Sequence, residues 1–346
     1  MRKKIFRHVI AFAVSIAAAA ALTVPAAAST SYETVEDNNY GKYSYVSKLN
    51  VIYRVDMKKR SFKKIKTFKG VTNIHYISYR KGYLYFVLNK YKGSDMACDY
   101  IYRMKTNGKS LKKLAVGSQP AIMGGKIYYL AGLRHGSGGD AYTTVRGINK
   151  MSLNGSGKKR LLTGTNVTDL ACASGRIRYK TSDNIYKVSA LNTDGSASTL
   201  NINWDGNSPI IHSSTDKLLL EYPSSTYQQG LSESGKSLVA KINDNGYLSR
   251  GYRSLGFMNG CGFYRSTTLS SGRVTGTLYM FKTGENAKGK KVKYLKNGFP
   301  MDVLAVNKGS IVLAQTYNGG GNKNAAISVM KTNGKGYRVV SKYFQW

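Results

Sequence analysis

Short runs of alternating apolar and polar residues occupy most of this chain, and one run recurs along it. Most copies have an apolar residue, a variable residue that is often tyrosine, a basic residue and a second apolar residue, and most are followed by a polar turn that ends in glycine. The clearest copies span residues 101–108, 148–155 and 327–334. Alternation with a period of two is typical of a half-buried strand, and Asn-Gly pairs supply the positive φ angles of tight hairpins. The phrase therefore predicts a strand followed by a hairpin turn.

Seven copies of the phrase are spaced by about 46 residues on average, which lies within the range of propeller blades. Their second residues are Tyr53, Tyr102, Asn149, Tyr186, Ala240, Tyr279 and Ser328. A second hairpin precedes most copies, for example at residues 77–88 around Lys81-Gly82 and at 303–313 around Lys308-Gly309. Two hairpins per repeat give four antiparallel strands, so the sequence predicts an all-β, seven-bladed β-propeller with four-stranded antiparallel blades.

The first repeat leaves the blade count and the closure of the ring open, and six or eight blades remain alternatives. Residues 32–36 are one candidate for the innermost strand of the first blade, with residues 43–48 as its second strand. In that case the first blade is complete and the ring closes without strand exchange. In the other case the N-terminal strand completes the last blade.

The N-terminus has the three parts of a secretory signal peptide. Four basic residues precede an apolar run over residues 9–24, and Ala26-Ala27-Ala28 then forms a cleavage site. A membrane anchor is the alternative, but the apolar run is slightly short for a spanning helix. We therefore expect residues 1–28 to be a signal peptide and residues 29–346 to be a single propeller domain, secreted or associated with the cell envelope, with no membrane span after cleavage.

The net charge bears on the partner. The formal charge is +36, and loss of the four basic residues in the signal peptide leaves +32. Such an excess favours anionic partners through long-range attraction and counterion release. For an exported protein the candidates are an anionic glycopolymer of the teichoic-acid kind, anionic lipid headgroups or an acidic polysaccharide, whereas nucleic acid is not expected in vivo. The alternative is a basic surface that is only solvated.

The phrase Ile-Tyr-Arg-Met-x-x-Asn-Gly, followed by a Lys-Lys-Leu strand at residues 111–114, resembles exported bacterial propellers of the low-density-lipoprotein-receptor-related type, which are kin to the TolB and YWTD propellers. The resemblance covers essentially the whole mature chain as a repeat pattern. The Tyr-Trp-Thr-Asp tetrapeptide is absent, and residues 84–87 and 127–130 stand in its place. The resemblance implies the propeller fold and carries over no catalytic residue, since most such proteins have no assigned function.

Residues suited to catalysis or metal binding are scattered. His75, His135 and His212 fall in three different repeats, and none has the spacing of a metal-binding pair. Asp169 and Asp302 fall on predicted inner strands and would face the central channel. An exported carbohydrate-active enzyme that uses these carboxylates is therefore the alternative function. We expect no catalytic constellation, no metal and no cofactor.

The loops indicate where binding would occur. The links between the second and third strands are longer and more varied than the other turns, for example at residues 131–146 and 265–275. Variable loops on a rigid scaffold are where binding residues concentrate. Tyrosines beside basic residues suit sugar stacking and anion pairing. The candidate ligand-binding residues are Tyr91, Lys92, Arg134, His135, Tyr142, Tyr227, Arg273, Tyr317 and Lys323.

Together these patterns predict an exported binding propeller, expected to be a monomer. Its partner would be an anionic glycopolymer or another exported protein. Ordinary surface loops without a ligand are the alternative to the candidate binding residues.

N-terminal sequencing tests the signal peptide. Material secreted by the native host is expected to begin at or within a few residues of Ser29, because the small-residue site ends at Ala28. An intact Met1 terminus on protein retained in the cytoplasm would contradict the prediction.

Overall fold

The computed structural model describes most of the chain after the predicted signal peptide. The described ranges are residues 38–91, 97–136, 142–173, 175–184, 187–198, 202–203, 210–214, 217–221, 227–231, 237–241, 253–270, 273–282, 290–296, 298–317 and 325–342. Residues 1–37, with the signal peptide and the candidate strand at 32–36, lie outside them. No helix in the described ranges is long and apolar enough to cross a lipid bilayer.

The strands follow one another as antiparallel neighbours. The first sheet contains β1 (Asn39–Tyr40), β2 (Tyr43–Lys48), β3 (Val51–Asp56) and β4 (Ser61–Thr67). A seven-stranded sheet contains β5 (Asn73–Arg80), β6 (Tyr83–Tyr91), β7 (Ala97–Lys105), β8 (Lys112–Met123), β9 (Lys126–His135), β10 (Tyr142–Ser152) and β11 (Lys159–Thr163). A third sheet contains β12 (Val167–Ala173), β13 (Arg176–Thr181), β14 (Lys187–Leu191) and β15 (Ile202–Asn203).

The second half of the chain continues this pattern. Two hairpins come next, formed by β16 (Ile210–Ser214) with β17 (Lys217–Glu221) and by β18 (Tyr227–Leu231) with β19 (Ser237–Lys241). A further sheet contains β20 (Arg253–Met258), β21 (Cys261–Ser270), β22 (Arg273–Lys282) and β23 (Lys290–Leu295). The last sheet contains β24 (Pro300–Asn307), β25 (Ser310–Thr316), β26 (Ala325–Lys331) and β27 (Arg338–Val339).

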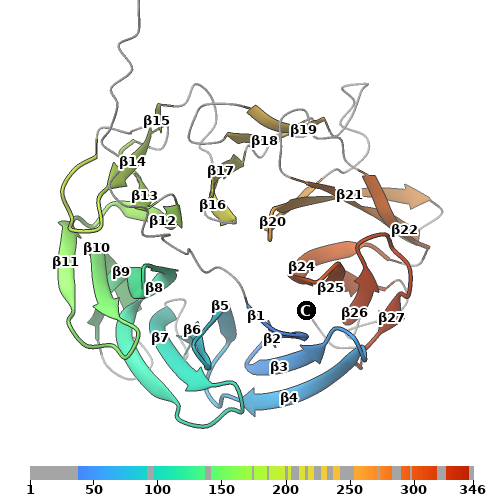
Figure 1. The fold of residues 1–346 in the computed structure, drawn as a ribbon, viewed down its shortest axis with the longest axis horizontal. Helices are drawn as coiled ribbons and strands as arrows, with labels where there is room; N and C mark the ends of the chain where they lie inside the picture. Colours follow the sequence, from blue (N-terminus) through green and yellow to red (C-terminus); the bar gives the residue numbers. More distant parts are fainter. Residues whose placement is uncertain are drawn as a thin grey trace, which may run out of the picture. The chain divides into compact units, whose positions relative to one another are not determined.

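Successive sheets contact one another mainly through strands near their beginnings (Figure 1). β2 contacts β5, β8 contacts β12, β12 contacts β16, β16 contacts β20, and β20 contacts β24. β24 in turn contacts β2, so the contacts return from the last sheet to the first. The predicted all-β class is confirmed, and these successive antiparallel sheets fit a β-propeller.

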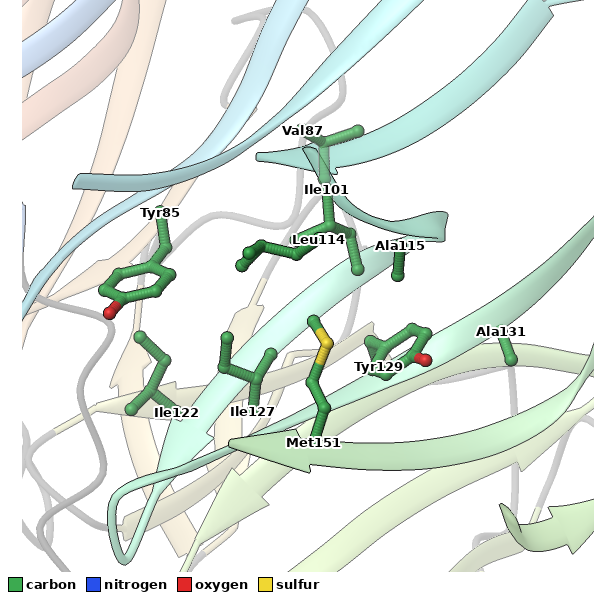
Figure 2. Close-up of a cluster of buried hydrophobic side chains, with 10 residues drawn as sticks. All are labelled: Tyr85, Val87, Ile101, Leu114, Ala115, Ile122, Ile127, Tyr129, Ala131 and Met151. Atoms are coloured by element: carbon green, nitrogen blue, oxygen red, sulfur yellow. The ribbon is translucent and has the colours of Figure 1, made fainter. Parts of the chain in front are cut away.

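One long strand explains why two four-stranded units merge into the seven-stranded sheet. The first half of β8 pairs with β7, and its second half, from Gly117 onward, pairs with β9. Figure 2 shows side chains from both sides of this junction pointing toward each other, with Tyr85, Val87 and Ile101 on one side and Ile127 and Tyr129 on the other. All are at most 2% exposed. The apolar faces are therefore buried between adjacent units.

The first and last sheets are joined without a shared strand among the described residues. Val46 and Val55 of the first sheet pack in one cluster with Val312 and Ile327 of the last. Amide side chains add hydrogen bonds. Asn38 donates to the Leu304 carbonyl at 2.8 Å, Asn39 donates to the Val306 carbonyl at 2.8 Å, and Asn307 donates back to the Tyr43 carbonyl at 3.1 Å. The described first sheet has its own four strands, with β1 in the innermost position.

Four copies of the recurring phrase form the same turn. After β7, β10, β14 and β26, the Asn or Asp side chain accepts a hydrogen bond from the N–H of the residue after the glycine, at 3.0, 2.9, 2.8 and 3.0 Å respectively. The glycine has positive φ in each turn and lies against the outer strand of the preceding unit. Gly334 is the tightest case, because a Cβ there would lie 1.9 Å from the carbonyl oxygen of Val292. The Asn-Gly signal therefore both reverses the chain and joins neighbouring units.

Some of the basic residues in the phrase have a structural role. Arg103 donates to the carbonyl of Leu153 at 3.1 Å, and Lys150 donates to that of Thr193 at 2.8 Å. Both acceptors lie in the turn of the next unit along the chain. Part of the positive charge therefore holds adjacent units together and is not displayed to a partner.

Alanine substitutions at two glycines of the last sheet distinguish the cost of backbone strain from the cost of a steric clash. Gly334 and Gly309 have similar φ angles of +76° and +74°, but nothing lies within 4 Å of a Cβ at Gly309. Gly309→Ala is expected to lower the free energy of unfolding by about 1–2 kcal/mol, the cost of a left-handed alanine. Gly334→Ala is expected to cost several kcal/mol more, since the Val292 backbone must move. Urea unfolding measures both, and equal losses would contradict the docking role of the turn.

Candidate functional site

Four strand ends meet at one end of the seven-stranded sheet. The end of β6 pairs with the start of β7 through Lys90 and Cys98. The end of β9 pairs with the start of β10 through His135 and Tyr142. β8 joins these two hairpins, because its residue Val116 pairs with Tyr100 and the next residue pairs with β9. This end of the sheet carries two of the long links that the sequence singled out.

The β9–β10 link is shorter than predicted. The sequence suggested a loop over residues 131–146, but β9 and β10 extend the hairpin through Ala131–His135 and Tyr142–Arg146. The same correction applies at residues 265–275, where β21 and β22 stay paired up to Ser270 and Arg273. Both hairpins continue past the apolar core because cross-strand hydrogen bonding does not require burial. The candidate residues of these links are therefore held on strands.

Three basic side chains gather around Tyr100, a residue that is 7% exposed. The Nζ atom of Lys113 lies 3.8 Å from the centroid of the Tyr100 ring, and that of Lys90 lies 5.7 Å from it. Ammonium groups at such distances are attracted to the electron-rich face of the ring. Arg134 is close enough for its charge to act on both Tyr100 and Lys113. We call Lys90, Tyr100, Lys113 and Arg134 the Tyr100 cluster.

The charges of the Tyr100 cluster repel one another. The pKa of Lys113 is lowered, first by burial and then by the positive charges of Lys90 and Arg134. The pKa of Tyr100 is raised, first by burial and then by the Cys98 thiol beside it. Within the described part of the chain, no carboxylate forms an ion pair with any of the three basic residues. A bound anion would relieve this repulsion, so the arrangement suits an anionic ligand.

The structure brings two of the predicted binding residues, His135 and Tyr142, together. The Nε2 atom of His135 lies 2.7 Å from the Thr144 hydroxyl, and the His135 ring stacks on Tyr142 at 4.7 Å between centroids. Arg134 is the residue next to His135 on β9. Successive residues of a strand point to opposite faces, so Arg134 and the stacked pair lie on opposite sides of the hairpin.

Two of the other predicted residues, Arg273 and Tyr317, lie in other sheets or directly after one of their strands. Arg273 begins β22 and is exposed. The hydroxyl of Tyr317 lies 2.9 Å from that of Tyr337, and both contact the side chain of Gln315. Tyr91 ends β6 and Tyr227 begins β18, but their side chains lie outside what the structure describes, as do residues Lys92 and Lys323.

Both carboxylates of the alternative function have interactions within the protein. Asp169 forms an ion pair with Lys180 at 3.0 Å. Asp302 lies on β24 and has interactions of its own. The side chain of His212 lies outside the described set. Among the described residues, no group of three metal-ligating side chains could hold a metal ion.

The sequence did not single out Lys90, Tyr100 or Lys113. Lys113 belongs to the basic strand that follows each turn, and the sequence offered only its repeated Lys-Lys pattern. The pairing of Tyr102 with Lys113 places this lysine beside the ring of Tyr100. The sequence therefore shows the lysine pattern, but the strand register decides that Lys113 lies beside Tyr100.

No protein-family model matches the chain, and no curated protein sequence matches it. Solved structures are similar. Hsv2 from Kluyveromyces lactis is 12% identical with a TM-score of 0.50, over 90% of this chain and 96% of that one. The β-propeller domain of the trilobed protease from Pyrococcus furiosus is 12% identical with a TM-score of 0.41, over 77% and 96% of the two chains. A nidogen/laminin complex is 10% identical with a TM-score of 0.45, over 74% and 93%.

Enzymes also occur among the similar structures. An acylaminoacyl peptidase is 13% identical with a TM-score of 0.42, and this chain spans about half of its length, 51%. At these identities the likeness concerns the fold alone.

The mutual repulsion within the Tyr100 cluster can be measured. Arg134→Gln removes a positive neighbour and is expected to raise the pKa of Lys113, because protonation then meets less repulsion. Titration of ¹³C-methylated lysines by NMR measures this pKa. Arg273→Gln removes the same charge from β22 in another sheet and should leave the pKa of Lys113 unchanged. A pKa that stays constant or falls in Arg134→Gln would show that the cluster is not coupled.

Proposed function

We propose that this protein is an exported binding protein that holds an anionic glycopolymer of the cell envelope at the Tyr100 cluster. One observation carries the proposal: three basic side chains converge on Tyr100 with no carboxylate ion-paired to them among the described residues. All three basic side chains are exposed, so an external anion can reach them. A cluster of like charges on an accessible surface favours such an anion.

The predicted export of the protein and its net charge support the choice of partner. The N-terminal pattern of charged, apolar and small residues supports export, and the mature charge of +32 supports an anionic partner. We further propose that the chain belongs with the exported bacterial propellers that its repeat resembles. An acidic exported protein is the other candidate partner, and it would use the same electrostatic attraction.

The scaffold is proposed to have seven blades. Four sheets each have four strands, counting those that begin at β1, β12, β20 and β24. The seven-stranded sheet supplies two further units that share β8, and the β16–β17 and β18–β19 hairpins contact each other as a seventh. This count agrees with the seven copies of the sequence phrase.

Binding at such a site would depend strongly on salt. Each exposed basic residue near a charged polymer contributes roughly 1 kcal/mol or less at physiological ionic strength. Affinity therefore comes from several contacts together and falls steeply as salt rises. Tyr100 is too buried to stack on a sugar itself, so its part is to hold the two ammonium groups in place.

A pair of charge-matched variants tests the proposal. The first replaces Lys90, Lys113 and Arg134 with glutamine. The second replaces Lys59, Lys63 and Lys64, three exposed lysines of the first sheet, with glutamine. Binding of residues 29–346 to poly(glycerol phosphate) is measured at low and physiological salt, with an uncharged glycan as a negative control.

We expect the first variant to lose more than about tenfold in affinity and to show a shallower salt dependence. The second variant is expected to lose less than about threefold. Equal losses in both would mean that net charge alone attracts the polymer, and the proposed site would then be wrong. Binding that is indifferent to salt would also contradict it.

A further inference from the structure

A second group of polar residues is centred on the first strands β5, β8 and β12. At its centre is Tyr76 on β5, a tyrosine that is 52% exposed. Tyr76 is one of three exposed tyrosines among the residues whose burial the structure describes, with Tyr40 on β1 at 53% and Tyr294 on β23 at 47%.

Tyr76 has a backbone conformation that tyrosine rarely adopts. Its φ angle is +54°, within the left-handed region. The pairing of β5 with β6 shifts register between His75 and Ser78, so Tyr76 lies in a β-bulge. A bulge redirects side chains, and bulges are common next to binding sites. Left-handed residues other than glycine carry strain and tend to occur where a ligand is held.

The next first strand repeats this conformation. Gln119 on β8 has a φ angle of +47° and also lies in a register shift, between Ser118 and Ala121. Its side-chain amide donates to the Thr168 carbonyl at 3.1 Å, and its oxygen accepts the N–H of Leu170 at 2.8 Å. The same side chain lies close enough to the Tyr76 hydroxyl to act on its pKa. Gln119 therefore joins β8 to β12 beside Tyr76.

Two carboxyl groups act on the Tyr76 hydroxyl. Asp99 accepts a hydrogen bond from Asn89 at 2.7 Å, and Asp169 is ion-paired with Lys180 at 3.0 Å. The pKa of Tyr76 is raised, first by burial and then by the negative charges of Asp169 and Asp99. The residue is thus half-exposed to solvent while its hydroxyl lies within electrostatic range of two carboxyl groups.

These groups match the chemistry of a sugar. The CH-rich face of a pyranose ring packs on an exposed aromatic ring, and its hydroxyls bond to carboxylates and amides. We propose that Tyr76, with Asp99, Gln119 and Asp169, forms a binding site for a neutral sugar residue. This site is separate from the proposed anion site at Tyr100. It binds through ring stacking and hydrogen bonds, whereas the anion site binds through charge. We propose a binding role and not a catalytic one for this site, because the Asp169 carboxylate is already ion-paired with Lys180.

The first experiment measures binding of residues 29–346 to maltotriose, cellotriose and tri-N-acetylchitotriose by calorimetry. At least one trisaccharide is expected to bind, with little dependence on salt. Tyr76→Asn is expected to weaken that binding by more than about tenfold, because asparagine tolerates the left-handed conformation but has no ring. Its melting temperature should not fall. Tyr294→Asn is the matched control, a 47% exposed tyrosine on the outer strand β23, and should bind as the wild type does.

The second experiment needs no variant. Nitration by tetranitromethane is expected to modify the exposed Tyr40, Tyr76 and Tyr294 in the free protein, and the bound trisaccharide should protect Tyr76 but not Tyr294. Replacement of Lys113 and Arg134 by glutamine should leave trisaccharide binding unchanged, which separates this site from the proposed anion site. The proposal is overturned if none of the three sugars binds, if binding survives in Tyr76→Asn, or if Tyr76 is not protected.

Discussion

The apolar contact between adjacent sheets is the constraint on which the rest of this structure depends. Each sheet has two faces with buried residues, as β6 shows, where Leu84, Tyr85, Phe86, Val87 and Leu88 are all nearly inaccessible to solvent. Such a sheet needs a neighbour on both sides. The first and last sheets can satisfy this need only by packing on each other, and the cluster of Val46, Val55, Val312 and Ile327 does so. Hydrogen bonds from Asn38, Asn39 and Asn307 then give this junction its register.

The same constraint divides the positive charge of the chain into two groups. Arg103 and Lys150 lie where one unit meets the next, and they satisfy backbone carbonyls of the neighbouring turn. Lys90, Lys113 and Arg134 lie at the strand ends, where they meet other cations. Net charge alone does not distinguish these groups. Of these five residues, Lys90, Lys113 and Arg134 are the ones exposed to an anionic partner.

The two proposed sites use different parts of the same sheet. The Tyr100 cluster belongs to strand ends that cross-strand pairing brings together, and its chemistry is electrostatic. The Tyr76 site belongs to bulged first strands, and its chemistry is stacking and hydrogen bonding. A glycopolymer that carries both sugar and anion would engage both kinds of chemistry. The seven-stranded sheet and β12 provide the rigid support that both sites need.

The sequence by itself determined the strand pattern, the hairpin turns and the repeat. Alternation and Asn-Gly or Lys-Gly pairs depend only on residues that are adjacent in the chain, which is why the turns at Lys81-Gly82 and Lys308-Gly309 were predicted correctly. The sequence also placed Arg134, His135 and Tyr142 in one link, and the structure extends that link into a hairpin. Tertiary structure alone decided that Lys113 and Arg134 meet at Tyr100, because strand register sets that contact. It also decided the exposure of Tyr76, because a bulge on a first strand depends on packing against the next sheet and has no glycine to mark it.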